Sequence, residues 1–226
     1  MTTRKSAAAM TATEQNRYKN TINQLLADPM NPYGKLVAIH GDMGHDMHGM
    51  DATGEQRFLP WHRVFLLRFE EMLQTIDPNN FIPYWDWTTD NKVPAWLLNF
   101  KPTVVIPGQG TFTVVRKTEI PKKVNVTAIM ALANFTTFTN HLETGPHNHI
   151  HTAVGGPGGT MSQIPTAPAD PIFWMHHAQI DRLWSQWQTA HPGQNPSLSG
   201  ASAVLDPWTE KVNQVLAIAA LEYNYQ

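Results

Sequence analysis

Histidine is the residue type in this chain that is best suited to chemistry. Eleven histidines are present, whereas cysteine is absent. The absence of cysteine excludes disulfides, thiolate catalysis, iron–sulfur clusters and cysteine-bound zinc. Neutral imidazole is instead a ligand for zinc, copper, iron and nickel. The positions of the histidines therefore indicate what kind of site the chain forms.

The segment PHNHIHTA places three histidines within five residues. On a helix, His147 and His151 share one face because they are four residues apart, whereas His149 points away from them. A solvated polar turn is the alternative, but it would explain one histidine more easily than three. The spacing predicts that His147 and His151 bind one metal ion.

The segment DPIFWMHHAQIDRLWSQW has the apolar pattern of a core helix, interrupted by His176 and His177. A lone histidine in such a helix is more often a hydrogen-bonded core residue than a ligand. An HxxxH pair lies elsewhere in the chain, and catalytic metal sites usually have three protein ligands. We therefore expect this helix to supply the third ligand of the ion that His147 and His151 bind. Asp181 is expected to accept a hydrogen bond from a neighbouring histidine ring.

A third group of histidines lies in HGDMGHDMHGM and RFLPWHRVFLLRFE. His62 occupies the apolar segment, and His40, His45 and His48 precede it. Taken alone, the Met- and His-rich loop could equally be an exposed copper-scavenging tract. Together with His62 on a buried helix, two of the upstream histidines would complete a second three-histidine site.

Two all-histidine sites narrow the choice of metal. A hydrolytic dizinc site would normally contain a bridging carboxylate, and no HxHxDH motif is present. Paired three-histidine sites favour dioxygen chemistry at two copper ions.

Apolar periodicity, proline positions and capping residues predict the elements that hold these histidines. Helices are expected over residues 14–26, a short stretch ending at 40, 60–76, 126–132, 138–151, 171–190 and 207–221. Residues 101–116 are expected to form a β-hairpin, and 81–87 a packed aromatic loop. Pro60 is placed in the first turn of its helix, where a missing N–H costs nothing.

The composition suits one globular domain over residues 1–226. Sixteen basic and 18 acidic residues give a net charge of −2 without a basic block, so nucleic acid and anionic membranes are not expected partners. No stretch approaches the ~20 apolar residues of a membrane span, and no secretory signal is visible. We therefore expect a cytoplasmic protein.

Four motifs together resemble the tyrosinase family of type-3 copper proteins, which includes catechol oxidases and molluscan haemocyanin units. They are RFLPWHRVFLLRFE, IPYWDW, HNHIHTAVGG and DPIFWMHHAQIDRLW, in the family's order. The resemblance implies a mainly α fold, in which an antiparallel four-helix bundle houses a dicopper centre, with a small β-hairpin and long loops. It also implies two copper ions as cofactors and dioxygen as co-substrate.

The same resemblance assigns three histidines to each copper ion. They are His40, His48 and His62 for the first copper, and His147, His151 and His176 for the second. His177 is then expected to lie next to the copper ligands without binding copper itself. The family usually has a histidine nine residues before the one in PWHR, where this chain has Thr53. His48 is preferred to its competitor His45 because its HGM resembles a haemocyanin motif.

The resemblance implies hydroxylation of monophenols and oxidation of o-diphenols to o-quinones, chemistry that belongs to melanin biosynthesis. Asn148 matches an asparagine proposed in some tyrosinases to orient a proton-accepting water. Glu143 is the expected carboxylate partner, with a plain surface role as the alternative, and Met161 is expected near the substrate. Small phenols and diphenols are the expected partners, and a copper chaperone and a second copy of the chain are further candidates.

Three other functions stay open: a diphenol-only catechol oxidase, a haemocyanin-like oxygen carrier and a copper-storage protein. Asn148 favours a tyrosinase over a catechol oxidase. The buried helical histidines oppose a storage role. Because the sequence ends soon after its last matching helix, we expect no added domain of the kind that covers the site in carriers, which counts against a carrier. No cysteine is available for the Cys–His thioether of many members. The form resembles the short bacterial enzymes.

Overall fold

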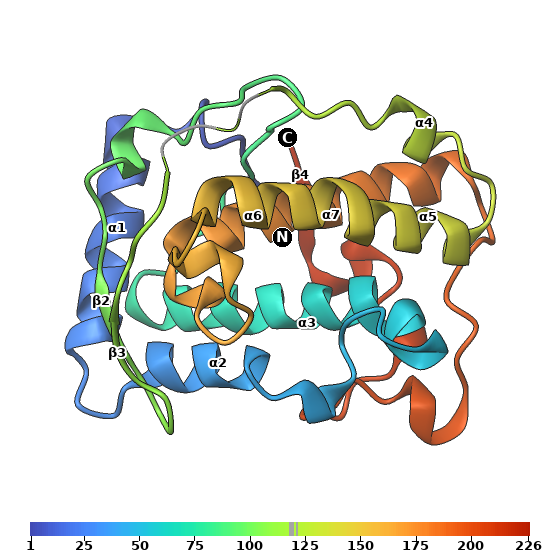
Figure 1. Cartoon of the computed structure of the whole chain (residues 1–226), viewed down its shortest axis with the longest axis horizontal. Helices are drawn as coiled ribbons and strands as arrows, with labels where there is room; N and C mark the ends of the chain where they lie inside the picture. Colours follow the sequence, from blue (N-terminus) through green and yellow to red (C-terminus); the bar gives the residue numbers. More distant parts are fainter. Residues whose placement is uncertain (118–119, 121) are drawn as a thin grey trace.

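The computed structural model describes residues 1–117, 120 and 122–226, and the chain is mainly helical (Figure 1). Its α-helices are α1 (Ala12–Ala27), α2 (Pro32–His40), α3 (Ala52–Ile76), α4 (Thr127–Met130), α5 (Phe135–Leu142), α6 (Asn148–Gly155) and α7 (Pro171–Ala190). Its strands are β1 (Thr2–Arg4), β2 (Thr103–Ile106), β3 (Gly110–Thr113) and β4 (Tyr223–Tyr225). In the described part of the chain, no helix has the length and apolar character needed to cross a membrane.

The central element is α3, which lies between α2 on one side and the layer of α5, α6 and α7 on the other (Figure 1). Phe58, Phe65 and Phe69 of α3 are completely buried. The ring of Phe69 stacks on Trp174 of α7 with centroids 4.0 Å apart, which joins the two longest helices. The predicted helical core is confirmed, and the predicted hairpin is present as β2–β3, packed beside α2.

The start of α3 differs from the prediction. Asp51 caps the helix by accepting hydrogen bonds from the backbone N–H groups of Thr53 and Gly54. The helix then runs through Pro60, so the prediction that Pro60 lies in the first turn is wrong. An internal proline removes one backbone hydrogen bond, but Pro60 is buried and the packing of the surrounding core outweighs that local cost.

The last helix of the core, α7, has the bounds that its sequence predicts. The Asp170 side chain accepts a hydrogen bond from the N–H of Ile172, and Pro171 occupies the first helical position. Every residue from Pro171 to Asp181 is buried. The two histidines of this helix therefore lie inside the protein.

The single helix predicted from residue 138 to 151 is two helices joined by a π-helical turn. The turn spans Glu143–His147 and contains Pro146, whose ring nitrogen has no hydrogen to donate. Such a turn absorbs the missing bond without ending the helix axis, and α5 and α6 remain in line (Figure 1). The turn brings Glu143 and His147 to the buried side.

The helix predicted over residues 207–221 is absent. This segment contains the short 3₁₀ turns Val212–Gln214 and Ile218–Leu221, followed by β4. β4 pairs in parallel with β1, with Thr2 opposite Tyr223, so the two ends of the chain lie side by side. This pairing joins residues more than 200 positions apart in the sequence and leaves no local pattern to predict it.

A buried ionic network lies beneath the terminal strands. Arg4 pairs with Glu70 of α3 at 2.9 Å, and Arg63 of α3 pairs with Asp181 of α7 at 2.5 Å. The Tyr223 hydroxyl donates to the Asp181 carboxylate at 2.6 Å. Asp181 therefore clamps the two central helices together, and its predicted bond to a histidine ring is not among the contacts of the described residues.

Candidate metal centre

Three histidines converge where α2 and α3 meet, and we call them the first cluster. His40 is the last residue of α2, His48 lies in the following loop, and His62 lies on α3. One ring nitrogen from each lies within 4.8 Å of those of the other two, and all three rings are buried. The Nε2 atoms of His40 and His62 are 3.4 Å apart.

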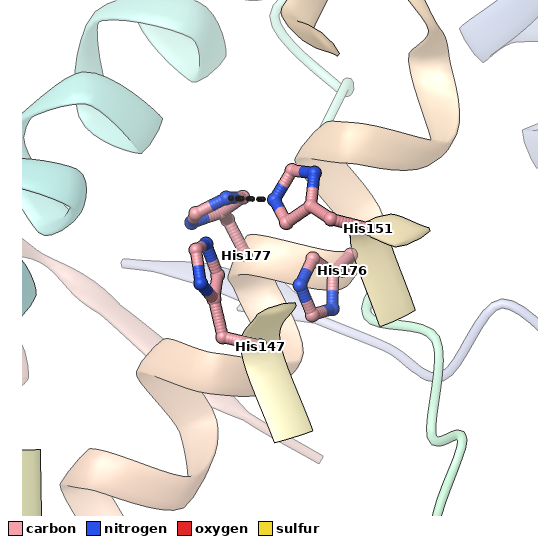
Figure 2. Close-up of side chains that lie close together, drawn as sticks. All are labelled: His147, His151, His176 and His177. Atoms are coloured by element: carbon pink, nitrogen blue, oxygen red, sulfur yellow. Dashed lines mark hydrogen bonds between the residues drawn. The ribbon is translucent and has the colours of Figure 1, made fainter. Parts of the chain in front are cut away.

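Four histidines form the second cluster: His147 at the end of the π turn, His151 on α6, and His176 and His177 on α7 (Figure 2). The Nε2 atoms of His151 and His177 face one another at 3.2 Å. The His177 ring also stacks on His62 of the first cluster, with centroids 4.5 Å apart and planes 13° from parallel. The two clusters are therefore in direct contact.

Five of the seven histidines donate a hydrogen bond from Nδ1 to an oxygen atom. The pairs are His40 with the Ile164 carbonyl, His48 with the Glu143 carboxylate, His62 with the Phe58 carbonyl, His147 with the Asn148 side-chain oxygen, and His151 with the Met161 carbonyl. These oxygens only accept, so the ring nitrogen must donate. A neutral imidazole that donates from Nδ1 keeps a free lone pair on Nε2, the atom that then binds a metal.

His176 has the opposite arrangement. The indole N–H of Trp87 donates to Nδ1 of His176 at 3.1 Å, so a neutral His176 carries its hydrogen on Nε2. That nitrogen has no lone pair for a metal. The neighbouring His177 receives no such hydrogen bond, and its Nε2 faces His151. The chemistry of the rings therefore favours His177 over His176, the histidine to which the family resemblance assigns the copper ion.

His45, the competitor of His48, lies outside the first cluster. Its Nδ1 bonds to the Asp206 carboxylate at 2.6 Å, and its ring lies over Trp61 with centroids 6.3 Å apart. The His48 ring lies 5.3 Å from that of His40 between centroids. The structure therefore groups His48, and not His45, with the first cluster.

Burial favours the neutral form of four histidines in the two clusters. It lowers the pKa of His40, His62 and His147 well below the usual histidine value, and neighbouring imidazoles lower it further. Burial also lowers the pKa of His151 to about 4, although its hydrogen bond to the Met161 carbonyl acts in the other direction. Neutral imidazoles have lone pairs available for a metal at physiological pH.

The facing nitrogens have the spacing of ligands to one ion. Imidazole nitrogens about 2.0–2.1 Å from a tetrahedral metal lie about 3.3 Å from one another. The His40–His62 and His151–His177 distances are 3.4 and 3.2 Å. Because both rings of the first pair donate from Nδ1, neither Nε2 carries a hydrogen, and a cation between them would relieve the repulsion of their lone pairs. The Nε2 atoms of His48, His147 and His176 are all buried without a hydrogen-bond partner. In His48 and His147 the Nδ1 atom donates, so the unpartnered Nε2 has a free lone pair and fits a metal ligand, whereas the Nε2 of His176 carries a hydrogen.

A cavity of about 400 Å³ opens beside both clusters, which is within the usual size range of small-molecule sites. Its walls include His40, His48, Glu143, His147, Asn148, His151, Thr152, Met161 and Ile164. Asn148 and Glu143, which the sequence predicts to act on the substrate, line this cavity, as does Met161, which is expected near the substrate. The backbone carbonyls of Met161 and Ile164 were not predicted, because hydrogen bonds from histidines to backbone oxygens leave no signal in the sequence.

Known proteins are similar in sequence to this chain over the region that contains both histidine clusters. A sequence profile described as the common central domain of tyrosinase matches residues 30–119 and 110–190. A tyrosinase of Streptomyces antibioticus is 30% identical over 278 aligned positions, which cover 100% of this chain and 99% of that protein. A tyrosinase of Streptomyces glaucescens is 30% identical and covers 93% of both chains.

Solved structures show the same fold. A functional unit of octopus haemocyanin superposes with a TM-score of 0.83 at 23% identity, over 100% of this chain and 68% of that chain. A polyphenol oxidase of Thermothelomyces thermophila gives a TM-score of 0.70 at 18% identity, over 100% of this chain and 89% of that chain. The structures show the fold, whereas the profile match and the full-length relatives also show the family. Together with two histidine clusters that suit a type-3 dicopper centre, they show that the chain belongs to the tyrosinase family of copper oxidoreductases.

Proposed function

We propose that this protein hydroxylates monophenols and oxidises o-diphenols to o-quinones with dioxygen at two bound copper ions. One observation carries the proposal: the two histidine clusters meet at the stacked rings of His62 and His177 and open onto one cavity. Its volume suits a substrate built on a single phenol ring, which would reach ligands of both ions.

The proposed ligands differ at one position from those that the sequence suggests. They are His40, His48 and His62 for the first copper, and His147, His151 and His177 for the second. His177 replaces His176 because the Trp87 indole occupies the Nδ1 lone pair of His176 and leaves a hydrogen on its Nε2. His48 is retained over His45 because the ring nitrogens of His48 and the other two members of the first cluster lie within 4.8 Å of one another.

Copper bound at this site would supply the binding of dioxygen and the transfer of electrons from the phenol. The chain itself must hold the ring and remove the phenol proton. The Asn148 side-chain oxygen accepts a hydrogen bond from Nδ1 of His147 at 3.1 Å, which leaves its NH₂ group available to hold a water in the cavity. Glu143 lines the same cavity and places a carboxylate near that water. We propose that Asn148 and Glu143 together orient the water that takes the proton.

Oxygen uptake by the copper-loaded protein tests this function. The substrates are 4-methylphenol and 4-methylcatechol, and the zinc-loaded protein is the control because zinc has no redox chemistry. We expect oxygen uptake and quinone colour with both substrates. Uptake with 4-methylcatechol alone would favour a diphenol-only oxidase. Reversible oxygen binding by the reduced, Cu(I)-loaded protein without any quinone product would favour a carrier. A Cu(I)-loaded protein that neither binds nor consumes oxygen would contradict all three.

A further inference from the structure

Glu143 makes contacts that a role in orienting water does not require. One carboxylate oxygen accepts a hydrogen bond from Nδ1 of His48 at 3.1 Å. The backbone N–H of Gly49 is shared between the two oxygens, at 3.0 and 3.1 Å. Glu143 is only 6% exposed, so these bonds form away from bulk water, where charge-assisted bonds are strong.

His48 is the proposed ligand that most needs such support. Every other proposed ligand lies within or at the end of a regular helical element, whereas His48 lies in the loop between α2 and α3. The Nδ1 atoms of His40 and His62 are held by backbone carbonyls, which a packed chain provides without a dedicated side chain. For His48, the Glu143 carboxylate is the Nδ1 acceptor among the described residues.

We propose that Glu143 is a positioning residue that holds His48 in place as a ligand of the first copper. Glu143 lies in the π turn that ends at His147, a ligand of the second copper. One carboxylate therefore sets the tautomer and orientation of a loop histidine and ties the first copper site to the segment that carries the second. The inference rests on the proposed copper ligation.

Gly49 provides a way to test this contact without changing either partner. A Cβ atom at Gly49 would lie 2.7 Å from Oε2 of Glu143, the flexible end of that side chain. Gly49 is not among the residues with positive φ, so its backbone conformation accepts alanine. Gly49→Ala should therefore push the Glu143 carboxylate away from the His48 loop while Glu143 itself remains.

The experiment measures copper affinity and copper per chain by equilibrium dialysis followed by metal analysis, so it does not depend on activity. The variants are Glu143→Ala, Glu143→Asp, Glu143→Gln, Gly49→Ala and the double variant Glu143→Ala/Gly49→Ala. Glu71→Gln is the matched control, because Glu71 pairs with Arg68 at the surface, and circular dichroism checks that each variant folds.

Loss of a hydrogen-bond partner of a metal-binding histidine typically weakens metal binding by about 10- to 100-fold. We expect this loss at one of the two copper sites in Glu143→Ala, Gly49→Ala and Glu143→Asp, the last because the shorter side chain does not reach His48. Glu143→Gln should retain most of the affinity, since its amide oxygen still accepts from Nδ1, and the double variant should be no worse than Glu143→Ala.

Two wild-type-like copper sites in folded Glu143→Ala would overturn the positioning role. Additive losses in the double variant would do the same, because the two substitutions would then act independently. A wild-type chain that binds no copper would instead contradict the proposed function itself.

Discussion

The Nε2 atoms of His151 and His177 lie 3.2 Å apart, although their residues belong to different helices. The adjacent His176 turns the other way and accepts a hydrogen bond from Trp87 through Nδ1. Two neighbouring histidines on one helix thus have different chemistry. His177 directs its Nε2 atom at His151, whereas His176 is hydrogen-bonded to Trp87 within the core.

This difference predicts different outcomes for two matched substitutions. His177→Gln should lower the copper content from two ions per chain to one, because it removes a ligand nitrogen from the second site. His176→Gln should retain two ions, since it changes a ring whose Nε2 carries a hydrogen. Metal analysis after dialysis measures both. The assignment of His177 fails if the two variants exchange these outcomes.

Asp181→Asn should destabilise the copper-free protein strongly. The carboxylate lies at the centre of the buried network and pairs with Arg63 at 2.5 Å and with Arg4 at 3.5 Å. Removing one partner of a buried ion pair typically costs about 3–5 kcal/mol, because the other charge is left without compensation. Urea unfolding followed by tryptophan fluorescence measures the change.

The control for this substitution is Glu71→Gln, which breaks the surface pair between Arg68 and Glu71 and should cost about 1 kcal/mol or less. Losses of similar size in the two variants would show that the network does not clamp α3 to α7 as described.

The copper-free protein should lose stability as the pH falls below neutrality. Burial lowers the pKa of His151 from 6.5 to about 4, and it lowers those of His40, His62 and His147 as well. The unfolded chain then binds more protons than the folded chain, so the free energy of unfolding decreases as the pH falls from about 6.5 towards 4. Each such histidine contributes about 1.4 kcal/mol per pH unit in that window.

Urea midpoints at pH 7 and pH 5 measure this effect. A midpoint that is unchanged or higher at pH 5 would mean that the rings are not held neutral by burial.

Asn148→Ala should separate the two proposed activities. The loss of the side chain that holds the proton-accepting water should lower monophenol hydroxylation by about 100-fold, in the range typical of general base catalysis. Oxidation of the matching diphenol should change little. The ratio of the two kcat/KM values measures the effect, and an equal loss in both would indicate that Asn148 only supports His147.

Elements with strong local signals were predictable from the sequence. Asp170 and Pro171 mark the start of α7 correctly because a cap and a proline at the first position act locally. Pro60 misled the prediction of α3, because tertiary packing allows a proline inside a helix whose cap lies at Asp51. The pairing of β1 with β4 had no local signal, since it depends on contacts between the two ends of the chain.

The sequence predicted which motifs carry the candidate site, but not which histidine of each motif belongs to the site. His147 and His151 follow from their helical spacing. The choice between His176 and His177 depends on an indole N–H from Trp87, which lies 89 positions away in the sequence. The choice between His45 and His48 depends on how one loop folds onto Glu143 and Asp206. Such long-range contacts appear only in the folded protein.

Six histidines are proposed to hold two copper ions next to one another. The most direct test combines the copper content of the Cu(II)-loaded protein with its electron paramagnetic resonance spectrum. We expect two ions per chain and almost no signal, because two adjacent Cu(II) ions that share a bridging ligand couple magnetically. A single ion per chain, or two ions that give the full signal of isolated Cu(II), would contradict the account.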